Sequence, residues 1–183
     1  MINQKLSAMS TTTFKALISA ERIAARVAEL GAEISGDLAG INELTVVCVL
    51  KGAFIFAADL VRQLSVPCRV EFIRASSYGA GRASSGEVTL ENDGVFDLDG
   101  KHVLLVEDII DTGLTLSSIV VELQNQHLAS LRICALLDKP LARKAPIEAD
   151  YTGFTIPDHF VVGYGLDLDG RHRELPFIAI ANR

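Results

Sequence analysis

The segment from Val106 to Thr115 reads Val-Glu-Asp-Ile-Ile-Asp-Thr-Gly-Leu-Thr, and it continues an apolar run that begins at Val103. A short, nearly continuous run of branched aliphatic residues is typical of a strand that is buried on both faces of a parallel sheet. Acidic residues follow at the carboxyl end of this strand, and a Thr-Gly turn then precedes a helical pattern over 115–124. Ligands of open α/β sheets bind at the carboxyl ends of the strands. The segment therefore predicts a strand-turn-helix unit with a binding site at its turn.

The turn carries groups that bind phosphate. The backbone N–H groups from Thr112 through Thr115 stand at the N-terminus of the predicted helix beside two threonine hydroxyls, and Gly113 allows a ligand to approach closely. Just before them, Glu107 and Asp108 can hold sugar hydroxyls or a hydrated Mg²⁺, which prefers a few carboxylates together with water and substrate phosphates. The sequence thus predicts phosphate, sugar and metal sites side by side.

Helix capping is the alternative interpretation of these acids, because carboxylates stabilise the first turn of a helix. Glu107, Asp108 and Asp111 carry more negative charge than a cap requires, and they repel one another unless a cation or a ligand compensates them. Two other phosphate motifs are absent: the chain has no Gly-x-Gly-x-x-Gly, and the glycines before Lys101 lack the spacing of the Gly-x-x-x-x-Gly-Lys-[Ser/Thr] loop. The nucleoside triphosphatase and dinucleotide-binding classes are therefore disfavoured.

The rest of the chain alternates between the two periodicities of an α/β protein. Apolar residues at 23, 27, 30 and 34 line one face of a helix that Ser19 caps and Gly36 ends. Further strands are predicted at 45–50, 69–74, 103–106 and 132–137, and further helices at 54–64 and 115–124. The Gly- and Ser-rich stretch 76–86 is expected to be a mobile surface loop or hairpin arm. The tail from Phe154 onward is expected to add strands and turns to the edge of the sheet.

Composition limits the classes of function. The chain has 183 residues, 49% of them apolar and 22% charged, which predicts one globular domain over 1–183 with its core over 40–150. The net charge of −6 disfavours a protein whose main task is to bind nucleic acid. The longest apolar run, 53–58, is too short to span a membrane, and the polar stretch 1–13 lacks the apolar core of a signal peptide. The expected location is therefore cytoplasmic, with no membrane partner, and Cys48, Cys68 and Cys134 show neither disulfide nor zinc spacing.

Several motifs taken together resemble the hypoxanthine-guanine phosphoribosyltransferase family of the type I phosphoribosyltransferases. Residues 106–115 resemble its phosphoribosyl-pyrophosphate motif, Leu50-Lys51-Gly52 its pyrophosphate-binding turn, and Ser76-Ser77-Tyr78-Gly79 its flexible catalytic loop. Lys139 resembles its purine-contacting lysine, and 160–164 with Asp167 and Arg173 resemble its purine and pyrophosphate wall. The resemblance covers 46–175 and implies the type I phosphoribosyltransferase fold, an α/β fold whose central, mainly parallel sheet is flanked by helices. It also implies a flexible loop and a small hood made of the N-terminal and C-terminal segments.

The resemblance implies a role for each matching residue. The expected phosphoribosyl and phosphate contacts are Glu107, Asp108, Asp111, Thr112, Gly113, Leu114 and Thr115; the expected pyrophosphate contacts are Lys51, Gly52 and Arg173; Ser77 and Tyr78 belong to the flexible loop; Lys139, Phe160, Val161 and Asp167 are expected to bind the purine; and Glu107, Asp108 and Asp167 are the expected ligands of Mg²⁺. Leu114 stands where some animal members of the family carry a basic residue. A phosphate cradle acts through backbone N–H groups, so we expect this difference to matter little.

The implied reaction is the Mg²⁺-dependent transfer of a 5-phosphoribosyl group from phosphoribosyl pyrophosphate to N9 of hypoxanthine or guanine, which gives IMP or GMP and pyrophosphate. Asp111 is the expected catalytic residue, because a carboxylate beside purine N7 can accept or share the proton that the imidazole ring must lose. Lys139 would donate to purine O6 and reject a 6-amino group, which is itself a donor. Two alternatives stay open, a xanthine-preferring enzyme and a non-catalytic regulator on the same fold that binds nucleic acid. The implied assembly is a homodimer or a homotetramer.

Overall fold

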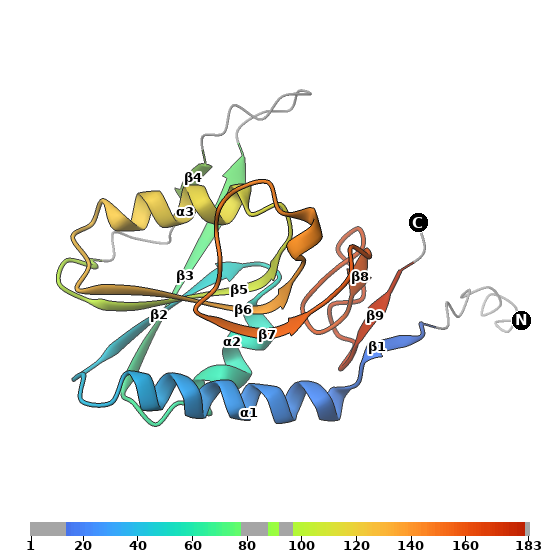
Figure 1. Cartoon of the computed structure of the whole chain (residues 1–183), viewed down its shortest axis with the longest axis horizontal. Helices are drawn as coiled ribbons and strands as arrows, with labels where there is room; N and C mark the ends of the chain where they lie inside the picture. Colours follow the sequence, from blue (N-terminus) through green and yellow to red (C-terminus); the bar gives the residue numbers. More distant parts are fainter. Residues whose placement is uncertain (1–13, 78–87, 92–96, 182–183) are drawn as a thin grey trace, which may run out of the picture.

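A mostly parallel sheet forms the centre of the molecule in the computed structural model, which describes residues 14–77, 88–91 and 97–181 (Figure 1). Within these residues the strand order is β4-β3-β2-β5-β6-β7. The strands are β2 (Leu44–Leu50), β3 (Cys68–Ser77), β4 (Val88–Glu91), β5 (His102–Ile110), β6 (Ser130–Asp138) and β7 (Tyr151–Thr155). Neighbouring strands run parallel except β3 and β4, which are antiparallel.

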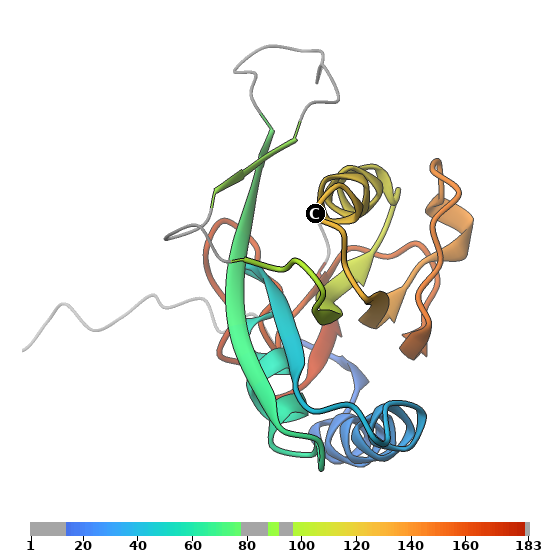
Figure 2. The ribbon, with the colours of Figure 1, turned by 90° about the vertical axis from the view of Figure 1, so that its left-hand side faces the viewer.

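Helices cover both faces of this sheet (Figure 2). Helices α1 (Ala20–Asp37) and α2 (Phe54–Val61) pack on one face, and α3 (Leu114–Gln124) packs on the other. Val46 and Cys48 of β2 belong to the core cluster on the α1 and α2 side, whereas Val47 and Val49 belong to the cluster on the α3 side. Burial of alternate residues on two faces explains why the strand is a continuous apolar run, and the predicted α/β class is confirmed.

The predicted helices and strands form, with differences at their ends. The Ser19 side chain caps α1 by accepting a hydrogen bond from the N–H of Arg22, as the sequence predicts, and the helix ends at Asp37. Helix α2 ends at Val61, before the predicted limit at residue 64. Strand β5 continues past the predicted end at residue 106 to Ile110, because β6 runs beside it and pairs with it over this stretch. Glu107 and Asp108 therefore lie within the strand, whereas Asp111 follows directly after its end.

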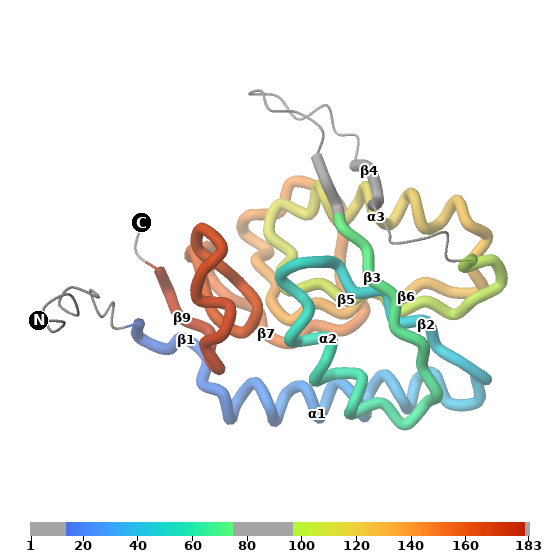
Figure 3. Tube along the Cα trace, turned by 180° about the vertical axis from the view of Figure 1, so that it is seen from behind, coloured from blue at the N-terminus to red at the C-terminus, as the bar shows by residue number. Residues whose placement is uncertain are grey.

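A second, smaller sheet is built from both ends of the described chain. Its strands are β1 (Ala16–Ile18), β9 (Ile178–Ile180) and β8 (Val161–Val162), in the order β1-β9-β8. The prediction that the tail from Phe154 onward extends the main sheet is correct only for β7, because β8 and β9 pair with the N-terminal strand instead. Figure 3 shows this small sheet beside the N-terminal end of α1 and the start of α2, in the place of the expected hood.

The Gly- and Ser-rich stretch begins inside the main sheet. Strand β3 runs through Ser77 and pairs with β4, so that Ser77 lies opposite Val88 in a hairpin arm. Of the two forms predicted for 76–86, a loop or a hairpin arm, residues 76 and 77 fit the hairpin arm, and residues 78–87 lie outside the described residues. Among the helices of the described residues, none combines the length and the apolar composition that crossing a membrane requires.

Candidate active site

A cavity of about 340 Å³ opens at the carboxyl edge of the main sheet. Strand β2 leads into α2 and β5 leads into α3, and because the two strands are parallel neighbours, both turns meet at this edge. The C-terminal segment after β8 contributes Asp167 and Arg173 to the lining of the cavity. The cavity is lined by Val49, Leu50, Lys51, Gly52, Glu107, Asp108, Ile109, Ile110, Asp111, Thr112, Gly113, Thr115, Leu116, Asp167 and Arg173. Most residues predicted to contact phosphoribosyl and pyrophosphate groups are thus brought together.

The turn between β2 and α2 presses against the acidic segment. A Cβ atom on Gly52 would stand 1.5 Å from Oδ2 of Asp108, so only glycine permits this contact. The peptide bond between Leu50 and Lys51 is cis, and the Lys51 side chain is exposed. Lys51 and the acids Glu107 and Asp108 therefore line the same cavity.

The adjacent carboxylates of Glu107 and Asp108 are partly buried at the end of β5. Burial and the neighbouring charge of Asp108 raise the pKa of Glu107 well above its usual value. Burial also raises the pKa of Asp108, while hydrogen bonds, including one that its carboxylate accepts from the N–H of Ile109, and the charge of Arg173 oppose the rise. A bound cation would stabilise the ionised forms of these two adjacent acids. Their surroundings therefore fit the predicted metal role better than they fit the alternative role of helix cap.

The start of α3 has the geometry of a phosphate cradle. Gly113 adopts a left-handed conformation with φ 79°, and the N–H of Leu114 makes a long hydrogen bond of 3.5 Å to the Thr112 hydroxyl. The first hydrogen bond of the helix runs from the N–H of Ser117 to the carbonyl of Gly113. The N–H groups of Thr115 and the following residue therefore have no carbonyl partner within the helix and can serve an anion.

The C-terminal side of the cavity is formed by an ion pair. Nη2 of Arg173 lies 2.6 Å from Oδ1 of Asp167, and Oδ2 of the same carboxylate accepts a hydrogen bond of 2.7 Å from the N–H of Gly170. Nη1 of Arg173 donates to the carbonyl of Gly165 at 2.5 Å. Throughout 14–77, 88–91 and 97–181, no three ligand-type side chains form a ready cage for a metal ion. Direct metal ligation by Asp167 together with the β5 acids is thus not built into this geometry.

Lys139 lies behind Asp111 and does not line the cavity. Its side chain is 5% exposed, and its ammonium group is 3.3 Å from Oδ2 of Asp111 and 3.6 Å from Oδ1 of Asp158. Asp111 is 49% exposed at the rim. The two residues predicted to select the purine are therefore in contact, although 28 positions separate them in the sequence.

Three other predicted residues, Phe160, Val161 and Leu114, are not among the residues that line the cavity. Phe160 is half-buried against the small core cluster of the second sheet, and Val161 is buried in β8. Leu114, at the start of α3, is 52% exposed. Nothing of Tyr78 or of the side chain of Ser77 lies within the described residues.

The sequence patterns did not indicate two residues that the structure places beside Asp111 and Lys139. Nη1 of Arg143 donates to the backbone carbonyl of Asp111 at 2.9 Å, and its Nη2 pairs with Asp138. Asp158 is the second carboxylate beside Lys139. Asp138 and Lys139 come directly at the end of β6, and this accumulation of charge at a carboxyl edge is the signal that could have pointed to Arg143 four residues on.

Known proteins similar to this chain identify its family. The family model described as the phosphoribosyl transferase domain matches residues 14–169. A hypoxanthine phosphoribosyltransferase of Haemophilus influenzae is 48% identical over 164 residues, which cover 88% of this chain and 92% of that protein. A hypoxanthine-guanine phosphoribosyltransferase of Mycobacterium avium is 47% identical over 167 residues, which cover 88% of this chain and 82% of that protein.

A solved structure agrees with the sequence relatives. The crystal structure of a hypoxanthine-guanine phosphoribosyltransferase from Bacillus anthracis superposes with a TM-score of 0.87 at 44% identity, covering 93% of this chain and 100% of that chain. Sequence and fold therefore give the same answer, and the resemblance noted in the motifs is confirmed. The chain belongs to the phosphoribosyltransferase family, in its hypoxanthine-guanine phosphoribosyltransferase branch.

Proposed function

We propose that this chain transfers the 5-phosphoribosyl group of phosphoribosyl pyrophosphate to N9 of hypoxanthine or guanine in the presence of Mg²⁺. The observation that carries the proposal is the convergence of three kinds of group on one cavity. Its lining includes the cations Lys51 and Arg173, the acids Glu107 and Asp108, and the N-terminus of α3. A donor with a 5-phosphate, two ribose hydroxyls and a pyrophosphate requires these three groups within one cavity.

The acids at the end of β5 are the proposed holders of ribose and metal. Glu107 and Asp108 suit a hydrated Mg²⁺, which keeps several waters and takes only one or two carboxylates together with substrate phosphates. Asp167 would act through a water molecule, because its carboxylate is already paired with Arg173. The bound Mg²⁺ would supply charge neutralisation to the pyrophosphate as it leaves.

The remaining steps of the proposed reaction are assigned to residues of the chain itself. Lys51 and Arg173 stabilise the departing pyrophosphate, while the N–H groups at the start of α3 hold the 5-phosphate. Asp111 shares the N7 proton of the purine and Lys139 donates to its O6. Phe160 is proposed to stack on the purine, and Val161 offers its backbone to the edge of the ring. By analogy with glycosyl transfer, bond breaking precedes bond making, so that no protein nucleophile is required.

We further propose that the chain assembles as a homodimer or a homotetramer. Val70 and Phe72 lie on one face of β3, opposite residues of β2 that face the α1 and α2 layer, and both stay exposed, as does Phe54 at the start of α2. Large apolar side chains gathered on one side of a molecule favour association with a second copy. Light scattering should show an oligomer for the unchanged chain and a smaller species for Phe72→Glu; a monomer in both would contradict the proposal.

We also propose that the protein is cytoplasmic, and the support for this location is that its cysteines form no disulfide. Cys48, Cys68 and Cys134 are all free, and free thiols persist in the reducing compartment of a cell.

The deciding experiment is a pyrophosphate-release assay with phosphoribosyl pyrophosphate and Mg²⁺, run in parallel on hypoxanthine, guanine, xanthine and adenine. Turnover of hypoxanthine or guanine with adenine inert supports the proposal and ranks the 6-oxopurines. Turnover confined to xanthine would assign the chain to a xanthine-preferring enzyme. Silence on all four bases, with the folded protein still binding phosphoribosyl pyrophosphate, would instead favour a regulator.

A further inference from the structure

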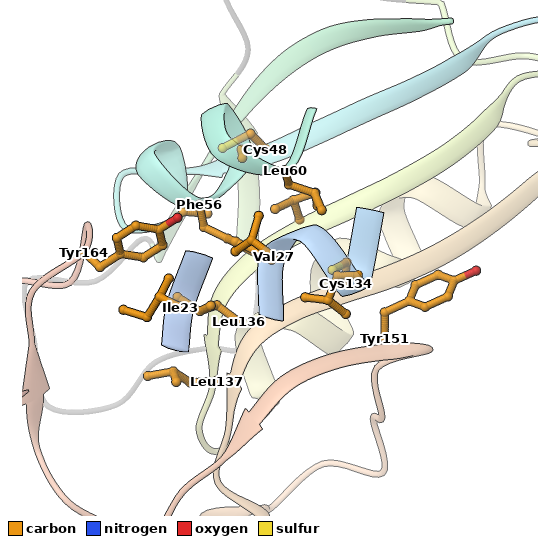
Figure 4. Packing of buried hydrophobic residues seen from close by; sticks show 14 of the residues in the cluster. Ile23, Val27, Cys48, Phe56, Leu60, Cys134, Leu136, Leu137, Tyr151 and Tyr164 are labelled. Carbon is orange, nitrogen blue, oxygen red and sulfur yellow. The ribbon is translucent and has the colours of Figure 1, made fainter. Parts of the chain in front are cut away.

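A partly buried hydrogen bond joins the C-terminal segment to α2 outside the cavity. The hydroxyl of Tyr164 donates to Oδ2 of Asp59 at 2.5 Å, and burial together with this carboxylate raises the pKa of the phenol. The Tyr164 ring is 6% exposed and packs in the main core cluster beside Phe56 and Ile23 (Figure 4). Asp59 keeps a second partner, Arg62, on the same helix.

The backbone around Tyr164 is held in an uncommon conformation. Tyr164 has φ 49°, which bulky residues rarely adopt, and its N–H donates to the carbonyl of Leu175 at 2.8 Å. A left-handed residue of this kind persists only where its surroundings hold it in place, and such residues concentrate at functional sites.

The residue that follows Tyr164 contacts two of the residues that line the cavity, Gly52 and Arg173. Gly165 packs so closely on the turn before α2 that a Cβ atom there would be 2.0 Å from the carbonyl oxygen of Gly52. The carbonyl of Gly165 accepts the hydrogen bond from Arg173, and the N–H of Gly165 donates to the carbonyl of the same arginine at 2.9 Å. Displacement of the segment at Tyr164 would therefore move Arg173 relative to Gly52.

We propose that Tyr164 and Asp59 are positioning residues for the pyrophosphate half of the substrate. Their hydrogen bond fixes the C-terminal segment on α2 and thereby sets the separation between Arg173 on that segment and Lys51 on the turn that precedes the helix. The inference rests on the proposed function, in which these two cations bind pyrophosphate. It predicts that loss of the hydroxyl weakens binding of phosphoribosyl pyrophosphate while binding of the purine stays intact.

The chain contains a matched control for this hydrogen bond. Tyr151 is also 6% exposed and belongs to the same core cluster, and its hydroxyl donates to Oδ2 of Asp37 at 3.0 Å. It joins β7 to the last residue of α1, at the opposite end of the labelled cluster in Figure 4. Tyr151→Phe thus removes an equivalent tyrosine-aspartate bond without touching the cavity.

The test compares steady-state kinetics and melting temperatures. Tyr164→Phe should raise the KM for phosphoribosyl pyrophosphate by up to about tenfold, the factor that corresponds to the loss of one hydrogen bond to a charged group, while the KM for hypoxanthine stays within about twofold. Asp59→Ala should raise the KM for phosphoribosyl pyrophosphate by a similar factor. Asp59→Asn keeps an acceptor for the tyrosine hydroxyl, so its KM should stay close to that of the unchanged chain. Tyr151→Phe should lower the melting temperature comparably and leave all kinetic constants unchanged.

Three outcomes separate the hypotheses. An unchanged KM for phosphoribosyl pyrophosphate in folded Tyr164→Phe, or in folded Asp59→Ala should the first variant fail to fold, overturns the positioning role. An equal rise in Tyr151→Phe would also overturn it, because the effect would then follow stability alone. Arg173→Ala serves as the reference: if it leaves this KM unchanged, the pyrophosphate assignment in the proposed function fails instead.

Discussion

The ammonium group of Lys139 lies 3.3 Å from the carboxylate of Asp111, and the lysine side chain is 5% exposed whereas the carboxylate is 49% exposed. The lysine is thus buried behind an acid that reaches the rim of the cavity. A buried cation without a partner is strongly destabilising, so the carboxylates of Asp111 and Asp158 are needed to keep Lys139 in place. Lys139 and Asp111, the pair proposed to recognise the purine, therefore depend on each other for their position. Each can be tested by replacing it alone.

Replacement of Asp111 by asparagine tests its role as proton acceptor. Asp111→Asn keeps the shape and a hydrogen-bond acceptor but cannot take the N7 proton, so kcat should fall about 100-fold or more while the KM for phosphoribosyl pyrophosphate stays within about threefold. Asp158→Asn is the matched control, because it also faces Lys139 but does not line the cavity. Equal losses in turnover and in donor binding for Asp111→Asn would contradict the assigned role.

Replacement of Lys139 tests selection of the base. Lys139→Gln removes the charge that is proposed to meet purine O6, and the amide can also accept a hydrogen bond from a 6-amino group. The kcat/KM for hypoxanthine should fall about 10- to 100-fold, and the ratio of kcat/KM for hypoxanthine to that for adenine should decrease. Lys144→Gln, at an exposed lysine on the same connection, should leave both values unchanged. A variant that loses hypoxanthine turnover with its selectivity intact would show that Lys139 has a structural role only.

The strand-turn-helix unit at 106–115 was predictable because its signals are local. Branched aliphatic residues mark β5, and a single Thr-Gly turn separates them from the helical pattern of α3. The same holds for α1, where one serine and an apolar stripe define the N-terminus and the buried face. Since both turns of the cavity follow parallel strands, predicting the strands also predicts which residues meet.

The contacts that complete the site could not be predicted because they join distant parts of the chain. Nothing near Gly52 in the sequence indicates that the Asp108 carboxylate fills the place of its missing side chain. Strands of two or three residues, such as β8, carry too short a pattern to reveal that they pair away from the main sheet. The partners of Arg143 likewise include a backbone carbonyl, which no residue pattern records.

A methyl group at Gly52 should disrupt the site. In Gly52→Ala the new Cβ would overlap Oδ2 of Asp108, so the turn or the carboxylate must move, and we expect kcat/KM to fall at least 100-fold. Gly36→Ala is the control, since that glycine is in α1 with nothing within 4 Å of the added atom. It should raise the free energy of unfolding by about 0.5 to 1 kcal/mol and leave activity unchanged. Full activity in Gly52→Ala would show that the close contact with Asp108 is dispensable.

The final prediction concerns the stability of the chain without metal or substrate. Because the pKa of Glu107 is raised by burial and by the adjacent Asp108, the folded protein keeps a proton that the unfolded chain releases above the ordinary carboxyl pKa. The unfolding free energy contributed by this group therefore falls as the pH rises from that value towards the raised one. Glu107→Gln removes the cost of ionising this buried carboxyl in the folded protein. With a chelator present, the melting temperature of the variant should therefore exceed that of the unchanged chain by a few degrees at neutral pH. The two melting temperatures should converge near pH ~4. Mg²⁺ with phosphoribosyl pyrophosphate should stabilise the unchanged chain more than the variant. A constant difference across this pH range would show that the gain does not come from the ionisation of Glu107.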